Sequence, residues 1–210
     1  MDTLLSSMVF SVIGIHLLAV MSPGPDFIVS VRNSLTYSRK TGMWTGVGFG
    51  LGIGVHVVYS IFGLGLIISK SIVIYSVIKY LGAAYLIYIG IMSLRSKSNG
   101  IGVDETTQKE DISPLKAVRI GFLTNVLNPK ATLFFLSLFT IVVGPDVPTQ
   151  TLVFLGSILM INTSLWFIFL AYLVTHSKVL PVFEKYQNAF NKTFGGILIA
   201  IGLKVAFFTD

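Results

Sequence analysis

The sequence has few charged residues for its length. Only 11% of its 210 residues are Asp, Glu, Lys or Arg, whereas 53% are hydrophobic and the mean hydropathy is +0.82. A soluble domain carries about 25% charged residues, so most of the surface of this chain cannot face water. The composition therefore predicts an integral membrane protein. At about 20 apolar residues per span, the chain has room for six or seven helices and excludes a large domain outside the membrane.

The sequence also lacks cysteine, which excludes disulfides and thiolate metal sites. The motifs GxSxG, GxxxxGK[ST], GxGxxG and HExxH are absent, and no two histidines lie four residues apart. We therefore expect a protein that is not an enzyme and that uses no metal and no cofactor. Without a nucleotide site, any uphill transport must be driven by an ion gradient.

Six apolar stretches are present, at residues 3–25, 41–69, 71–94, 114–144, 147–177 and 190–208. The fourth is the weakest of them, because three bases interrupt it. A polar segment at about 96–113 separates the first three from the last three. These stretches predict an all-α integral membrane fold with six transmembrane helices. We expect one transmembrane domain over residues 1–210, with one half at about 1–95 and the other at about 114–210.

The bases are distributed unevenly between these stretches. Most of them lie in or beside the first, third and fifth connections, and only Lys70 and Lys204 lie near the other side. The positive-inside rule then places the odd-numbered connections in the cytoplasm and both termini on the outer side. The net charge of +6 is thereby explained by membrane topology, so we expect the lipid bilayer as a partner and no nucleic acid.

Proline motifs interrupt the first and fourth stretches at corresponding places in the two halves. Proline removes a helix N–H donor and clashes with the preceding turn, so both helices should break there. Because each half has three spans, a repeat must be inverted across the membrane, as in many secondary transporters. For the first motif, a loop followed by a surface helix stays open as an alternative. The predicted hinge residues are Pro23, Gly24, Pro25 and Pro129.

Charged residues beside these breaks are the candidate binding residues. Asp26 either stabilises the start of a new helix through its dipole or binds a proton or an amine. Lys130 opposes the dipole of the helix that it begins, so it needs an anion, either Asp26 or a ligand, unless it snorkels to the interface. A zwitterionic amino acid fits this pair, with its carboxylate on Lys130 and its ammonium on Asp26. Three asparagines would add hydrogen bonds: Asn33, Asn125 and Asn128.

Four glycines in the second stretch recur at four-residue spacing: Gly42, Gly46, Gly50 and Gly54. This spacing predicts close helix packing, although a sliding surface for alternating access would use the same smooth face. A homo-oligomer that forms through this helix also stays open. His56 in the same stretch is interpreted as a buried, hydrogen-bonded histidine, with a proton-relay role as the alternative.

At these positions the sequence resembles the LysE/RhtB family of bacterial amino-acid exporters. The resemblance rests on residues 16–26 (HLLAVMSPGPD), 38–40 (SRK), the Gly-rich second stretch, 80–90 (YLGAAYLIYIG) and 121–130 (GFLTNVLNPK). It is strongest to threonine and homoserine efflux proteins. The family implies six helices in the bacterial inner (plasma) membrane, with a small neutral amino acid and protons as partners. The residues alone also leave open a non-transporting membrane scaffold, an accessory subunit or a passive channel.

Overall fold

The computed structural model describes residues 3–70, 72–95, 110–142, 147–176 and 180–208, and these residues form helices without any strand. The helices are α1 (Thr3–Met21), α2 (Pro25–Thr36), α3 (Arg39–Lys70), α4 (Ile72–Arg95), α5 (Pro114–Val126), α6 (Pro129–Val142), α7 (Thr149–Val174) and α8 (Leu180–Phe208). The predicted all-α fold is confirmed for this part of the chain. Most of the polar segment expected at 96–113 lies outside the described residues.

Helix boundaries fall at both proline motifs. α1 ends at Met21 and α2 begins at Pro25, and the two axes differ in direction by 58°. In the second half, α5 ends at Val126 and α6 begins at Pro129. Each of the two motifs therefore separates a pair of shorter helices, as the loss of backbone donors at proline requires.

Within the described residues, two helices are long and apolar enough to cross a bilayer, at Arg39–Gly63 and Thr149–Val174. The bent pair α1 and α2 adds a third if it is counted as one span. Helix length and composition therefore do not by themselves give the expected six spans. The last helix also begins earlier than expected, at Leu180 instead of residue 190, because backbone hydrogen bonds continue a helix through polar residues.

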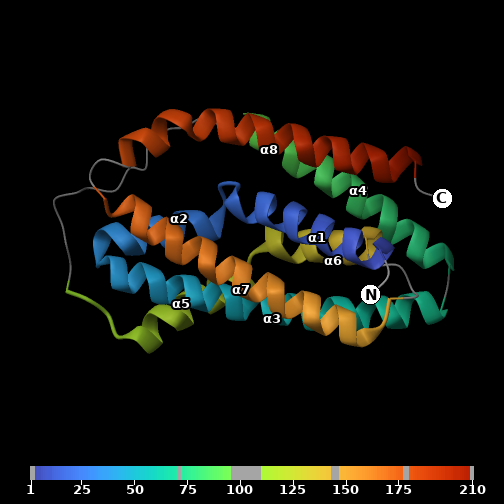
Figure 1. The fold of residues 1–210 in the computed structure, drawn as a ribbon, viewed down its shortest axis with the longest axis horizontal. Helices are drawn as coiled ribbons and strands as arrows, with labels where there is room; N and C mark the ends of the chain where they lie inside the picture. Colours follow the sequence, from blue (N-terminus) through green and yellow to red (C-terminus); the bar gives the residue numbers. More distant parts are fainter. Residues whose placement is uncertain (1–2, 71, 96–109, 143–146, 177–179, 209–210) are drawn as a thin grey trace.

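The helices form three layers (Figure 1). α4 packs along α8 on one side, and α3 packs along α5 and α7 on the other. α1, α2 and α6 lie between these layers, and the largest apolar cluster joins α1 and α6 to α3 and α7 on one side and to α4 and α8 on the other. The pair α1 and α2 runs opposite to the pair α5 and α6, so the two breaks meet near the middle of the molecule (Figure 1).

One end of the molecule is basic. The starts of α3, α5 and α8 and the ends of α2, α4 and α7 point toward it, whereas α1 starts and α8 finishes at the opposite end (Figure 1). The helix ends that point this way carry exposed bases, which are Arg32, Arg39, Lys40, Arg95, Lys116, Arg119 and Lys185. The start of α1 and the end of α8 therefore lie away from these bases.

The glycine face of α3 lies against α7. A Cβ added at Gly46 would be 2.9 Å from Phe167 Cβ, and one added at Gly50 would be 2.6 Å from Met160 O. Added Cβ atoms at Gly42 and Gly54 would also meet residues of α7. Glycine at these positions lets the two helices approach closely. Because α7 covers this face within one chain, a contact between two copies would have to use another surface.

Candidate functional site

The first break is an extended segment between α1 and α2. Gly24 is the N-cap of α2, with φ −173° and ψ −172°, and Pro25 is the first helical residue. Proline suits this position because it has no N–H to leave unpaired. The extended backbone does not itself require glycine, but a Cβ at Gly24 would lie 3.2 Å from Lys130 Cδ and 3.3 Å from its Nζ. Gly24 therefore leaves room for the Lys130 side chain.

The second break is organised by Asn128, for which the sequence suggested only a hydrogen bond to a ligand. Its Oδ1 accepts a hydrogen bond from the backbone N–H of Lys130 at 2.9 Å, and Pro129 follows it as the first residue of α6. Asn128 is thus the N-cap of α6, a position that asparagine favours. Its own backbone N–H donates to Asn125 O at 3.0 Å, which turns the chain tightly between α5 and α6.

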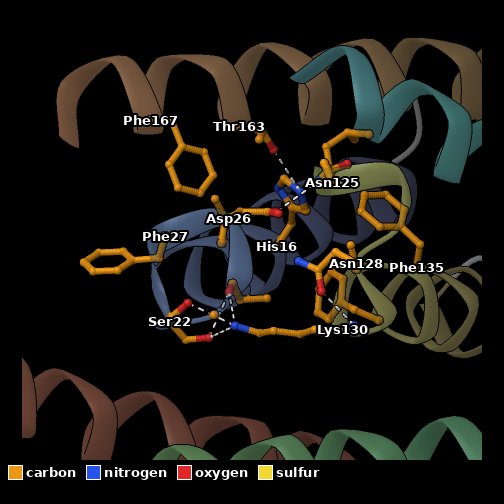
Figure 2. A pocket seen from close by; sticks show the side chains of 16 residues that line it. His16, Ser22, Asp26, Phe27, Asn125, Asn128, Lys130, Phe135, Thr163 and Phe167 are labelled. Carbon is orange, nitrogen blue, oxygen red and sulfur yellow. Dashed lines mark hydrogen bonds between the residues drawn. The ribbon is translucent and has the colours of Figure 1, made fainter. Parts of the chain in front are cut away.

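The amine of Lys130 reaches the C-terminal end of α1 (Figure 2). Its Nζ donates to Ser22 O at 3.0 Å and to Ala19 O and Pro23 O at 3.3 Å, and also to Ser22 Oγ. A helix leaves such carbonyls unpaired at its C-terminus, where its dipole favours a cation. The sequence left Asp26 or a ligand open as the partner of Lys130, and in this conformation the hydrogen bonds of the amine go to oxygens at the negative end of α1.

Asp26 lies in the first turn of α2. Its Oδ2 accepts a hydrogen bond from Asn125 Nδ2 at 2.7 Å, which joins α2 to α5 beside the breaks. Asp26 Oδ1 and Asn125 Oδ1 are both buried, and neither has a hydrogen-bond partner among the described residues. Buried polar atoms without partners cost about 1–3 kcal/mol each, so they mark a place where a proton or a bound donor would be stabilised.

A small cavity of about 40 Å³ lies beside these groups (Figure 2). Four of the five predicted binding residues line it, namely Asp26, Asn125, Asn128 and Lys130. His16 of α1 lines it too, fully buried, with Nε2 3.4 Å from Thr163 Oγ1 of α7. Pockets for small molecules measure about 300–1,000 Å³, so in this conformation the cavity has room for water but not for an amino acid.

The fifth predicted binding residue, Asn33, lies elsewhere. Its Nδ2 donates to Thr45 Oγ1 at 3.1 Å, which joins α2 to α3, and its side chain does not line the cavity. The asparagine therefore has a packing role in this conformation. It lies about two helical turns beyond Asp26, and a helix places residues seven apart on the same face but about 10 Å away.

His56 of α3 contacts the end of α5 at the second break. Its Nε2 lies 3.0 Å from Asn125 O and its Nδ1 lies 2.7 Å from the Tyr59 hydroxyl, which donates to Thr132 O at 3.2 Å. These contacts link α3 to the end of α5 and to the first turns of α6. The buried, hydrogen-bonded histidine expected from the sequence is observed, and its ring also stacks on Phe135 at 5.6 Å.

Two oppositely directed broken helices that meet at a buried polar cavity are the architecture of secondary membrane transporters. The comparison with known families gives the particular group. The chain belongs to the LysE type translocator family, which it matches over residues 17–208. It is thus a multi-pass membrane protein of a transport family, as the resemblance implied.

Individual relatives cover nearly the whole chain. The membrane protein YrhP of Bacillus subtilis is 35% identical over 199 residues, 91% of this chain and 95% of that protein. The threonine efflux protein of Escherichia coli is 27% identical over 190 residues, 90% and 92% of the two chains. The homoserine/homoserine lactone efflux protein of Salmonella typhi is 25% identical over 188 residues, 89% of each. No solved structure matches this chain.

Proposed function

We propose that the protein exports a small neutral amino acid, such as threonine or homoserine, from the bacterial cytoplasm in exchange for protons. The names of two relatives that match about nine-tenths of the chain support this substrate class. In this proposal the protein crosses the inner membrane six times, with α1–α2 and α5–α6 as broken spans. The two halves are inverted repeats, the basic end faces the cytoplasm, and both termini lie outside.

The observation that carries the proposal is the buried carboxylate of Asp26 at the meeting point of the two breaks. One of its oxygens has no hydrogen-bond partner among the described residues, and the other accepts a hydrogen bond from Asn125. A carboxylate in this setting can hold a proton or a substrate ammonium, but not both at once. This mutual exclusion is the simplest physical basis for exchange of an amino acid against protons.

Lys130 has the complementary role. Its amine lies at the same break and donates hydrogen bonds to neutral oxygens at the end of α1 and in the segment that follows it. Because these oxygens carry no formal charge, a substrate carboxylate would interact with the positive charge of the amine. The positive ends of α2 and α6, which both begin at the breaks, add further stabilisation for an anion. The four helix ends and two charges thus match the two charged groups of an amino acid.

The test is flux of radiolabelled threonine in proteoliposomes under an imposed pH gradient. We expect saturable accumulation against the threonine gradient by the purified protein, and loss of that accumulation in Asp26→Asn. Asp111→Asn is the matched control, because Asp111 accepts a hydrogen bond from Thr41 far from the breaks and its substitution should leave flux intact. Gradient-driven flux that survives Asp26→Asn would rule out the proton role.

The same measurement separates the other functional classes. A membrane scaffold or an accessory subunit would give no saturable flux by the purified protein for any amino acid. A passive channel would conduct threonine but would not accumulate it against its gradient. Either result would exclude the exporter function. The orientation is tested with a reporter that works only in the cytoplasm and is fused to the C-terminus. Activity of that fusion would exclude the proposed orientation.

A further inference from the structure

A second and much larger cavity, of about 590 Å³, lies on the opposite side of the breaks from the Asp26 cavity. Its wall is the part of α4 from Tyr85 to Arg95, and its floor includes Ser22, Asn128 and Lys130. Figure 2 shows Lys130 and Ser22 on the side of the breaks that faces α4, whereas Asp26 lies toward α7. We call this space the α4 cleft. Lys130 and the break residues beside it separate it from the Asp26 cavity.

The α4 cleft runs from the breaks along the last turns of α4, and the end of α4 points toward the basic end and lies beside the middle of α8. Tyr85 lies at its inner part, where its hydroxyl is 3.4 Å from Pro129 O, and Arg95 is the last residue of α4. Arg95 lies ten residues beyond Tyr85 on this helix, which corresponds to roughly 15 Å at about 1.5 Å per residue. The cleft is therefore long enough for an amino acid, and its volume of about 590 Å³ lies within the range of about 300–1,000 Å³ found for small-molecule sites.

The charges that line the α4 cleft have one sign. Arg95 and Lys130 are the charged residues among the described residues that line it, and no Asp or Glu is among them. Between these two cations the walls are mostly apolar or aromatic, with Tyr88, Met92 and Leu133 half exposed to the space. This pattern attracts a carboxylate at both ends, accommodates a modest uncharged side chain, and repels a second positive charge.

We propose that the α4 cleft is the loading site at which the substrate amino acid binds from the cytoplasm, and that Arg95 and Lys130 exclude amino acids with cationic side chains from it. The inference rests on the proposed function as an exporter. Arg95 captures the carboxylate at the mouth, and Lys130 receives it at the inner end. The Asp26 cavity stays too small for the amino acid during this step, so loading precedes any contact of the substrate with Asp26.

Site-directed thiol labelling tests the position of this site without background, because the chain contains no cysteine. Met92→Cys places one thiol in the α4 cleft, and Leu94→Cys places one on the same helix at a residue that is also exposed but does not line the cleft. In inside-out vesicles we expect threonine to slow labelling of Met92→Cys by a negatively charged thiol reagent at least fivefold. Lysine should give no protection, and labelling of Leu94→Cys should not respond to either amino acid.

Substitution of the mouth residue tests the charge selection. Arg95→Gln should raise the KM for threonine at least threefold with little change in the maximal rate, and should make lysine a better competitor of threonine flux. Arg32→Gln removes another exposed base at the basic end that does not line the cleft, and should leave both properties unchanged. Tyr88→Cys, which also lines the cleft, replaces Met92→Cys if that variant does not fold.

The outcomes separate this inference from the function on which it rests. Saturable threonine flux by the unsubstituted protein, together with labelling of Met92→Cys and Tyr88→Cys that threonine does not slow, would overturn the loading site and leave the exporter standing. Protection of Met92→Cys by lysine as effective as that by threonine would overturn the charge selection. Absence of flux for every amino acid would overturn the exporter itself.

Discussion

The hydrogen bond between Asn125 and Asp26 depends on a glycine in a third helix. A Cβ added at Gly52 of α3 would lie 2.6 Å from Asn125 Oδ1 and 2.8 Å from Asn125 Cβ. Ordinary contacts begin at 3.4 Å, so in Gly52→Ala the Asn125 side chain must move by the difference of 0.8 Å. If that movement is directed away from Asp26, the 2.7 Å hydrogen bond lengthens to about 3.5 Å, which is the limit of useful hydrogen bonding.

The expected effect on transport follows from the strength of that bond. A hydrogen bond to a charged group contributes about 1.5–3 kcal/mol, which is a factor of roughly 10–150 in an equilibrium that requires it. We therefore expect Gly52→Ala to reduce pH-gradient-driven threonine flux at least about tenfold, although Asp26 and Asn125 are both retained. Gly63→Ala on the same helix is the matched control, because an added Cβ there meets nothing within 4 Å.

The assay compares both variants with the unsubstituted protein in proteoliposomes under the same pH gradient. Unfolding in mixed detergent micelles is measured in parallel, since overpacking alone costs about 1–3 kcal/mol and a protein that does not fold says nothing about transport. Gly63→Ala should keep full flux. A folded Gly52→Ala variant that transports threonine at the rate of the unsubstituted protein would refute the role of the Asn125–Asp26 contact.

Three further substitutions test the contacts that hold the breaks, each by the free energy of unfolding in mixed micelles. Lys130→Met should lower it by about 3 kcal/mol, because hydrogen bonds to a charged donor contribute about 1.5–3 kcal/mol each; no loss would mean that the amine does not hold α1. Asn128→Ala should cost about 0.5–2 kcal/mol, as loss of an N-cap does, and Asn128→Ser should recover most of it, whereas equal stability of Ala and Ser would contradict the cap. His56→Phe keeps an aromatic ring but removes the two hydrogen bonds of the ring nitrogens to Asn125 O and the Tyr59 hydroxyl, so it should cost about 0.5–1.5 kcal/mol for each bond; unchanged stability would show that the ring nitrogens contribute nothing.

The sequence predicted the local features well because their causes are local. Proline removes a backbone donor wherever it occurs, so both breaks could be placed from Pro25 and Pro129 within a few residues. The start of α8 at Leu180 was missed for a related reason. Apolar runs report which part of a helix contacts lipid, and they do not report where its backbone hydrogen bonds begin.

The partners within the site could not be predicted in the same way. The sequence indicated that Lys130 needs a negative partner, but the groups that bind its amine are backbone oxygens at and just beyond the end of α1, which carry no signature in the sequence. Asn33 and Asn125 looked equivalent as amides near a break, and only the packing of α5 against α3 distinguishes them. The Asn-Pro pair at residues 128 and 129 is an N-cap signal that could have identified the role of Asn128.

The contact between Lys130 and the end of α1 has a consequence for how the two halves can separate. It joins an amine to carbonyl oxygens, and these are the partners that the two ends of an amino acid would seek. A zwitterion inserted at this point would give its carboxylate to the amine and its ammonium to the carbonyls, so both sides of the severed contact would regain a partner. The contact between Lys130 and the end of α1 therefore pairs the same kinds of group that a bound amino acid would engage. A zwitterion can break this contact because its two charges replace both partners.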